Sequence, residues 1–196
     1  MSIKTTKPLT TNDGKNERVA YGPAVWYTED DKYLFTYGHE LQLPEARLQN
    51  WYPASFTDPK DTNTRFQTME HYIMYSKAMC FNDEETAKKI LVAATPKEAQ
   101  ALGRQVKNFD GKKWREIVPE VAETGNWLKF SQVAECRDAL LATGNRILAE
   151  SNPEDRNWGI GFRGDEAAGR ESEWGTNLLG NAQMKVRDRL TKGETL

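Results

Sequence analysis

The sequence predicts an α+β fold, a mainly helical single domain with a small β element. The chain has 196 residues, which is the size of one ordinary domain. Its 38% of hydrophobic residues is enough to form a buried core. Helix-capping signals dominate the chain after residue 67, whereas β-favouring residues gather mainly before residue 38.

The N-terminal part combines a polar segment with a hairpin pattern. Residues 1–17 are polar and carry a turn signal, so we expect a flexible N-terminal arm; the domain then covers 18–191, with a C-terminal tail over 192–196. Two runs of β-favouring residues, 24–27 and 33–37, flank an acidic turn and predict a β-hairpin.

After an expected irregular loop over 48–66, the chain reads as a series of capped helices. Hydroxyl and amide residues followed by Glu three positions later are typical of helix starts. The first three helices are expected at about 69–81, 83–94 and 96–107, with Thr68, Asn82 and Thr95 as their caps. The remaining expected elements are a short helix from Asp110, a helix from Pro119 to Ser131, a helix over 133–143 that ends at Gly144, a short strand at 146–150, a loop over 152–176 and a final helix over 178–190.

Charge and composition exclude several classes of protein. The net charge of −2 argues against a polybasic nucleic-acid binder. No apolar run approaches the ~20 residues of a membrane span, and the first residues lack the apolar core of a signal peptide. Cys80 and Cys136 are too few for a disulfide framework. We therefore expect an intracellular, cytoplasmic protein, or a nuclear one in a eukaryote, with no membrane and no obligate protein partner.

Local cofactor and metal motifs fail on context. Residues 159–164 match G-x-G-x-x-G letter for letter, but the segment before them is no buried strand, so a dinucleotide fold is not predicted. His39 and His71 are the only histidines, and the two cysteines are far apart in the sequence. We expect no metal and no organic cofactor, and infer that the chemistry rests on carboxylates, lysines and aromatic residues.

One helix carries a charged pair with a spacing that suits a site. Glu70 and Lys77 are seven residues apart, so they share nearly one helix face at ~10.5 Å along the axis. Met74 lies between them on the same face. Spacing alone favours an exposed charged pair, because such pairs are routine on helix surfaces.

An ordered series of motifs in the chain resembles the NADAR family of intracellular N-glycosidases. The resemblance covers about residues 33–190, with Gln49 and Met69 standing where the family commonly has Ser. The matching residues are Leu48, Asn50-Trp51-Tyr52-Pro53, Glu70-His71-Tyr72, Lys77-Ala78, Thr95-Pro96, Glu98-Ala99, Gly103-Arg104, Trp114, Lys129-Phe130, Leu140-Leu141, Thr143-Gly144, Glu150, Asp155, Trp158-Gly159-Ile160-Gly161, Gly175, Asn177-Leu178-Leu179-Gly180, Met184 and Val186-Arg187.

The resemblance implies hydrolysis of the bond between ribose C1 and an exocyclic amine, with water as second substrate. The leading expectation is removal of ADP-ribose from ADP-ribosylated guanine in DNA, RNA or nucleotides. Hydrolysis of ribosylamine phosphate intermediates of riboflavin synthesis is the alternative. A module that binds ADP-ribose or a nucleotide without catalysis is a third interpretation.

Two mechanisms remain open for such a site. In the one that the resemblance implies, Lys77 forms a Schiff base with the opened sugar. We add the hypothesis that Glu70, whose ionised form a helix N-terminus would favour, carries protons between the lysine and the leaving amine. In the other, Glu70 and Asp155 flank the glycosidic carbon as a pair of carboxylates.

Eight further residues are expected to bind substrate, each with a structural alternative. Trp114 and Trp158 would stack on the base or sugar, or else fill the core. Asn50 would bind ribose hydroxyls or cap its own loop, and Arg104 would grip a phosphate or lie on a solvated helix face. The N-terminus of the last helix would hold an anion or form a tight turn. The residues expected in this last role are Asn177 and Gly180, and the same resemblance adds His71 and Gly159 to the substrate site.

Overall fold

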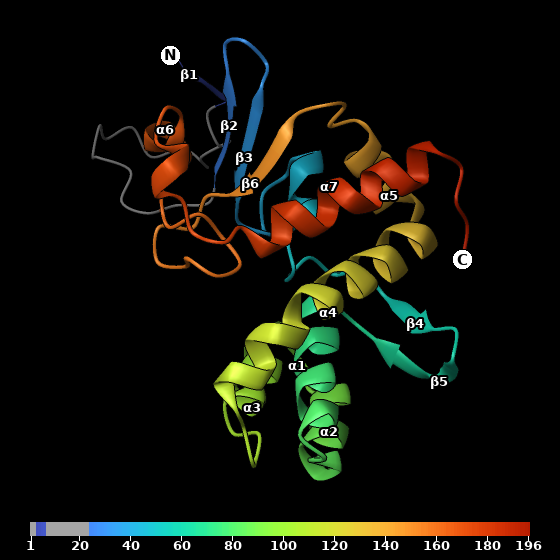
Figure 1. The fold of residues 1–196 in the computed structure, drawn as a ribbon. Coiled ribbons are helices and arrows are strands. Elements are labelled where there is room, and N and C mark those ends of the chain that lie inside the picture. The colour runs from blue at the N-terminus through green and yellow to red at the C-terminus, as the bar shows by residue number, and fades with distance from the viewer. Residues whose placement is uncertain (1–2, 7–23) are drawn as a thin grey trace, which may run out of the picture.

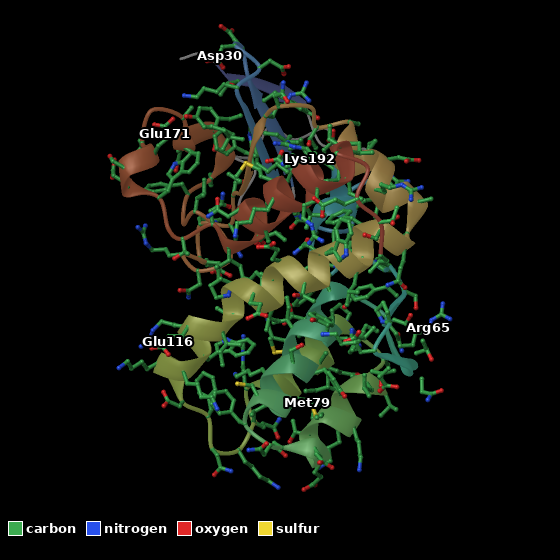
Figure 2. The ribbon with its side chains drawn as sticks, turned by 45° about the vertical axis from the view of Figure 1, so that its right-hand side comes forward. Asp30, Arg65, Met79, Glu116, Glu171 and Lys192 are labelled. Carbon is green, nitrogen blue, oxygen red and sulfur yellow. The ribbon has the colours of Figure 1, made fainter. Side chains whose placement is uncertain are left out.

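The computed structural model describes residues 3–6 and 24–196. Figure 1 shows a sheet end and a helical end, joined by the long helix α4 (Gly111–Gln132), which runs between them. In Figure 2, Asp30 and Glu171 mark the sheet end, and Met79 and Glu116 mark the helical end. In the part of the chain described, no helix has the length and apolar character of a membrane span.

A four-stranded sheet forms one end of the molecule. Its strands are β1 (Ile3–Thr6), β2 (Ala24–Thr28), β3 (Tyr33–Tyr37) and β6 (Ile147–Glu150), in the order β1-β2-β3-β6. β2 and β3 form the predicted antiparallel hairpin, and β6 is the predicted strand near residue 150. β6 runs parallel to β3, and parallel neighbours need a long crossover connection. Here that connection includes the whole helical end of the molecule.

Two segments differ from expectation in their strands. Residues 3–6 pair with β2 instead of forming a flexible arm, because backbone pairing at a sheet edge needs no apolar alternation; the rest of the expected arm, 1–2 and 7–17, lies outside the described residues. A 3-10 helix, η1 (Pro44–Leu48), ends where the expected loop over 48–66 begins. The loop itself contains a hairpin of β4 (Phe56–Asp58) and β5 (Asp61–Phe66).

The first three helices follow the predicted caps closely. α1 (Met69–Cys80) is capped by Thr68, and α3 (Pro96–Gly103) by Thr95. The cap of α2 (Glu84–Leu91) is Asp83, because Asn82 takes a left-handed backbone conformation that ends the preceding turn. α3 ends at Gly103, four residues before the expected Lys107. A Cβ on Gly103 would lie 2.0 Å from the sulfur of Met74, so only glycine fits this close contact with α1.

Pro119 does not start a helix, as the sequence suggested, but lies inside α4. A proline inside a helix costs about 3 kcal/mol, since one backbone hydrogen bond is lost. The apolar side chains that α4 buries beyond that point, including Ala122 and Phe130, offset this cost. α5 (Ala134–Leu141) and α7 (Leu178–Thr191) follow as predicted, and the expected loop between β6 and α7 holds only the short α6 (Gly164–Ala167) and η2 (Glu171–Glu173).

The core fixes the segment that enters the site. α7 packs on β6 and on α4, with Phe130, Leu148 and Val186 together in one apolar cluster. Within this cluster lies the fully buried Lys129, whose Nζ donates to the carbonyl of Gln49 at 2.9 Å; burial lowers its pKa to about 8. This contact holds the chain just before Asn50 in place.

Candidate active site

A cavity of about 820 Å³ lies where the two ends of the molecule meet. Its walls come from the C-terminal end of β3, the chain after η1, one face of α1, the end of α3, and the end of β6 with the loop that follows it. The lining residues are Tyr37, Gly38, His39, Glu40, Gln49, Asn50, Trp51, Glu70, Met74, Lys77, Gln100, Arg104, Glu150, Asn152, Glu154, Asp155, Asn157 and Trp158.

Glu70 lies in the first turn of α1 with its carboxyl in the cavity wall. It is only 6% exposed, and the indole Nε1 of Trp51 donates to its Oε2 at 3.2 Å. Burial raises the pKa of Glu70 to about 7, although hydrogen bonds from Trp51 and Gln100 oppose the rise. Desolvation therefore outweighs the helix N-terminus, which favours the ionised form. A carboxyl with a pKa near neutrality can both accept and donate a proton.

Lys77 lines the same cavity, about two helical turns after Glu70 on the same face of α1. Its Nζ donates to the carbonyl of Gly103 at 2.8 Å and lies 4.0 Å from the ring centroid of Phe109. Partial burial and the charge of Arg104 lower the pKa of Lys77, so more of it is neutral amine than in a free lysine. Glu70 and Lys77 therefore share one helix face and one cavity, as expected. The hydrogen bond of the Lys77 ammonium goes to the end of α3.

Asp155 and Trp158 reach the cavity from the loop after β6. Asp155 Oδ1 accepts from the backbone N–H groups of Asn157 at 2.8 Å and Trp158 at 2.9 Å. This is the Asx turn that the sequence offered as an alternative, and it coexists with a place in the cavity wall. The turn directs the partly buried indole of Trp158 to the cavity.

Asn50 and Arg104, both expected to bind substrate, also line the cavity. The Oδ1 of Asn50 is buried and has no hydrogen-bond partner among the described residues. Arg104 is exposed, and its Nη2 donates to Gln100 Oε1 at 2.9 Å. This bond leaves the amide N–H of Gln100 to serve Glu70.

His71 and Trp114 lie outside the cavity lining, contrary to expectation. The ring of the buried His71 pairs with Thr68 Oγ1 at 2.8 Å and the Ala93 carbonyl at 3.1 Å, and burial lowers its pKa. It joins the start of α1 to the end of α2. Trp114 packs against the apolar clusters beneath α1. Both residues therefore help to hold α1 in place and do not line the cavity.

Gly159, Asn177 and Gly180 also lie outside the lining, and the expected anion site is closed. The amides of Leu178 and Leu179 donate to carbonyl groups of the loop at Asn157 and Trp158, so they are not free for an anion. Each of the three instead approaches the backbone of β6.

Close backbone contacts explain why these three residue types are required. A Cβ on Gly159 would lie 2.7 Å from the carbonyl oxygen of Glu150, and one on Gly180 would lie 2.1 Å from that of Leu148. The amide of Asn177 donates to the Leu148 carbonyl at 2.8 Å and accepts from the Glu150 N–H at 3.2 Å. They therefore fix the last residues of β6 at the cavity.

Sequence reasoning left several side chains of the cavity wall unassigned, among them His39, Trp51, Gln100 and Glu150. His39 stands against Trp51, with ring centroids 5.5 Å apart, and follows Gly38, whose φ of 101° turns the chain out of β3. Trp51 and Glu150 stand within the matching motifs and His39 follows a predicted strand, whereas Gln100 carries no such signal. In the described part of the chain, no group of three or more His, Cys, Asp and Glu side chains is arranged to hold a metal ion.

Comparison with known proteins places these features in a family. A model of the NADAR domain matches residues 35–191. N-glycosidase R617 of Acanthamoeba polyphaga mimivirus is 34% identical over 165 residues, which cover 82% of this chain and 97% of that protein. Riboflavin biosynthesis protein VVA0006 of Vibrio vulnificus is 32% identical over 168 residues, 86% of this chain but 38% of that longer protein.

A solved structure shares the fold. The NMR structure of the Escherichia coli protein YbiA superposes with a TM-score of 0.67 at 26% identity, covering 83% of this chain and 87% of that one. YbiA of E. coli is named an N-glycosidase and is 32% identical over 123 residues, 63% of this chain and 69% of that protein. From the extent of the family match and the identity to R617, we conclude that this chain belongs to the NADAR domain family.

Proposed function

We propose that the protein is an N-glycosidase that releases ADP-ribose from guanine modified on its exocyclic amine, in a nucleotide or a nucleic acid. Relatives named N-glycosidases support hydrolysis of an N-glycosyl bond. The observation that carries the proposal is the shared cavity of Glu70 and Lys77, because burial moves the pKa of the acid up and that of the base down. Both shifts make proton exchange near neutral pH easier.

The cavity suits a substrate of nucleotide size. Its volume of about 820 Å³ lies in the range of pockets that enclose small organic ligands. Trp158 offers an aromatic face to a base, and the unpartnered Oδ1 of Asn50 can accept from a ribose hydroxyl. The exposed Arg104 beside it supplies a forked donor for a phosphate.

The chemical route starts with an opened sugar. The exocyclic nitrogen uses its lone pair to form an iminium at C1 as the bond from C1 to the ring oxygen breaks. Glu70 then accepts the proton of the Lys77 ammonium, and the neutral amine attacks C1. The carboxyl returns that proton to the base nitrogen and takes a second proton from the attached lysine nitrogen, whose lone pair forms the lysine iminium as the base leaves as the free amine. Water then attacks the lysine iminium and releases the sugar as its aldehyde, which closes to the ring form.

The alternative route uses Glu70 with Asp155 as a pair of carboxylates across C1. Both line the cavity, but two backbone N–H groups already occupy Oδ1 of Asp155 in its turn. Those bonds hold the loop and leave one oxygen for substrate. We therefore place this route second.

A second substrate class is favoured by one comparison. The relative named a riboflavin biosynthesis protein matches 86% of this chain. Ribosylamine phosphates of that synthesis carry the same bond between ribose C1 and an exocyclic amine, and a single phosphate that Arg104 can hold. They form the alternative substrate of the same cavity.

The function is tested with an oligonucleotide that carries ADP-ribosyl guanine. The parent protein and Lys77→Ala are incubated with it, and free ADP-ribose is measured by chromatography. We expect release by the parent alone. Release by both would contradict the lysine route and favour the pair of carboxylates. Release by neither would overturn this substrate; riboflavin intermediates would be assayed next, and binding without turnover would indicate a reader module.

A further inference from the structure

Glu150 is a residue of the cavity wall whose backbone is bonded on both sides, and the route above gives it no task. It ends β6, where it lies opposite Thr36 of β3. Its N–H donates to Asn177, and its carbonyl accepts from the N–H of Ile160 at 2.9 Å. Gly159 permits the close approach of the loop to that carbonyl. Both faces of its peptide backbone are thus fixed, which sets the position of its side chain.

The carboxyl of Glu150 is held in a setting that favours the protonated form. Its Oε2 is buried and accepts no hydrogen bond from any residue that the structure describes. Glu70, in contrast, receives two donors, from Trp51 and Gln100. A buried carboxylate without donors is far more costly than a neutral carboxylic acid. Of the two acids, Glu150 therefore retains its proton, whereas Glu70 is the better anion.

The groups that face Glu150 from neighbouring elements act in the same direction. The charges of Asp155 in the loop and of Glu70 on α1 oppose its ionisation, after burial as the largest cause, and its pKa is raised to about 8. On β3, the pKa of Tyr37 is raised by burial and then by the charges of Glu154 and Glu150. At neutral pH, the cavity thus holds a proton donor close to a proton acceptor.

Opening of the ribose ring requires such a donor. When the C1–O4′ bond breaks, the ring oxygen takes the bonding electron pair and needs a proton to become a hydroxyl. Glu70 is already committed to the exchange between Lys77 and the leaving amine. Resting on the proposed function, we propose that Glu150 is a second catalytic acid, which protonates the ribose ring oxygen O4′ as the sugar opens.

The step balances without any further reactant. The nitrogen lone pair forms the C1=N bond, the C1–O4′ electrons move to oxygen, and the proton of Glu150 completes the 4′-hydroxyl. The carboxylate left behind faces the positive iminium and stabilises it. After hydrolysis, the 4′-hydroxyl attacks the C1 aldehyde, its proton returns to Glu150, and the C1 oxygen takes the proton that Glu70 received from the lysine. The acid is regenerated in each cycle.

This role separates the two mechanisms. In direct displacement between two carboxylates, the ring oxygen donates electrons to C1 in the transition state. Protonation of that oxygen would oppose the reaction. An acid directed at O4′ is useful only where the ring opens.

The test is Glu150→Gln, which keeps the size of the side chain but cannot deliver a proton. We expect kcat on ADP-ribosyl guanine to fall by about 10²- to 10⁴-fold with little change in KM. We expect the rate of the parent to fall above about pH 8 as Glu150 ionises, and this alkaline limb to be absent from the residual rate of the variant. Glu123→Gln on the surface of α4 is the matched control.

A second readout bypasses ring opening. Glycolaldehyde has no ring, so with cyanoborohydride it should label Lys77 equally in the parent and in Glu150→Gln, as measured by peptide mass spectrometry. Trapping of the cyclic substrate should be lost only in the variant. If labelling by glycolaldehyde were lost as well, the substitution would have damaged the lysine site and the proposed role would be rejected.

Two further outcomes are decisive. An active parent with a fully active Glu150→Gln would overturn this inference alone, whereas a parent without turnover on either substrate class would overturn the proposed function and this inference with it. If Glu150→Gln fails to fold in a thermal melt, Glu150→Asp takes its place. Because Asp keeps a transferable proton at shorter reach, we expect reduced kcat with the alkaline limb retained; loss of that limb would contradict the role.

Discussion

Trp51→Phe offers a specific test of how the cavity controls Glu70. The substitution keeps an aromatic ring beside His39 but removes the N–H that donates to Glu70 Oε2 at 3.2 Å. A hydrogen bond to a charged group contributes about 1.5–3 kcal/mol. At 3.2 Å we take the lower end, which corresponds to about one pKa unit, since a unit equals about 1.4 kcal/mol.

The sign of the effect follows from which form the indole stabilises. The N–H favours the carboxylate, so its removal moves the pKa of Glu70 from about 7 to a higher value. If Glu70 must be ionised to accept the lysine proton, a shift of about one unit lowers the rate about fivefold at pH 7 and about tenfold at pH 6. The acid limb of the pH profile should move upward by the same amount.

The assay is the pH profile of kcat/KM for ADP-ribose release, with Trp174→Phe as control. Trp174 lies outside the cavity lining, where its Nε1 donates to the Ala167 carbonyl at 3.0 Å. Its substitution should leave the acid limb in place. An unchanged acid limb in Trp51→Phe, or one moved to lower pH, would refute the assignment of Glu70 as proton acceptor.

Three other predictions concern binding and stability. Arg104→Ala should raise the Kd of ADP-ribose about 10-fold or more by isothermal calorimetry, because a charge-assisted hydrogen bond is lost; an unchanged Kd would place the phosphates elsewhere. Gly180→Ala should lower the free energy of unfolding by about 1–3 kcal/mol, because the new Cβ would lie 2.1 Å from the backbone oxygen of Leu148; a variant as stable as the parent in urea would contradict the close packing. The carboxyl of Glu150 has a higher pKa folded than unfolded, so the native state binds more protons between about pH 4.5 and 8 and loses stability as pH rises through that window. Glu150→Gln lacks this loss, and its melting temperature relative to the parent should increase from pH 5 to pH 8; a constant difference would show that the carboxyl is not perturbed.

Local signals predicted most of the fold, because caps and alternation depend on neighbouring residues. Thr68 and Thr95 cap helices as the sequence indicated, and the hairpin of β2 and β3 lies where its two β-favouring runs stand. Local rules failed where distant contacts decide. Pro119 is carried inside α4 by packing along the whole helix, and β1 is held by pairing with β2.

The candidate site divides in the same way. Lys77, Glu70 and Asp155 line one cavity, and their catalytic roles remain predictions. Residues such as Asn177 and Gly180 matched the motifs equally well, but they hold β6 at the cavity and do not line it. A motif match cannot separate a residue that touches substrate from one that positions its neighbour. Glu150 also matched a motif but received no role, because its unpartnered oxygen becomes visible only when α1, β6 and the loop are packed together.

The central claim is that Lys77 becomes covalently bound to the sugar, and reductive trapping tests it most directly. The protein is incubated with ADP-ribosyl guanine and borohydride, which reduces the C=N bond to a stable amine, and the adduct is located by peptide mass spectrometry. The account predicts one sugar adduct on the peptide that contains Lys77, absent from Lys77→Ala. Continued turnover without any such adduct would contradict it and assign the reaction to Glu70 and Asp155.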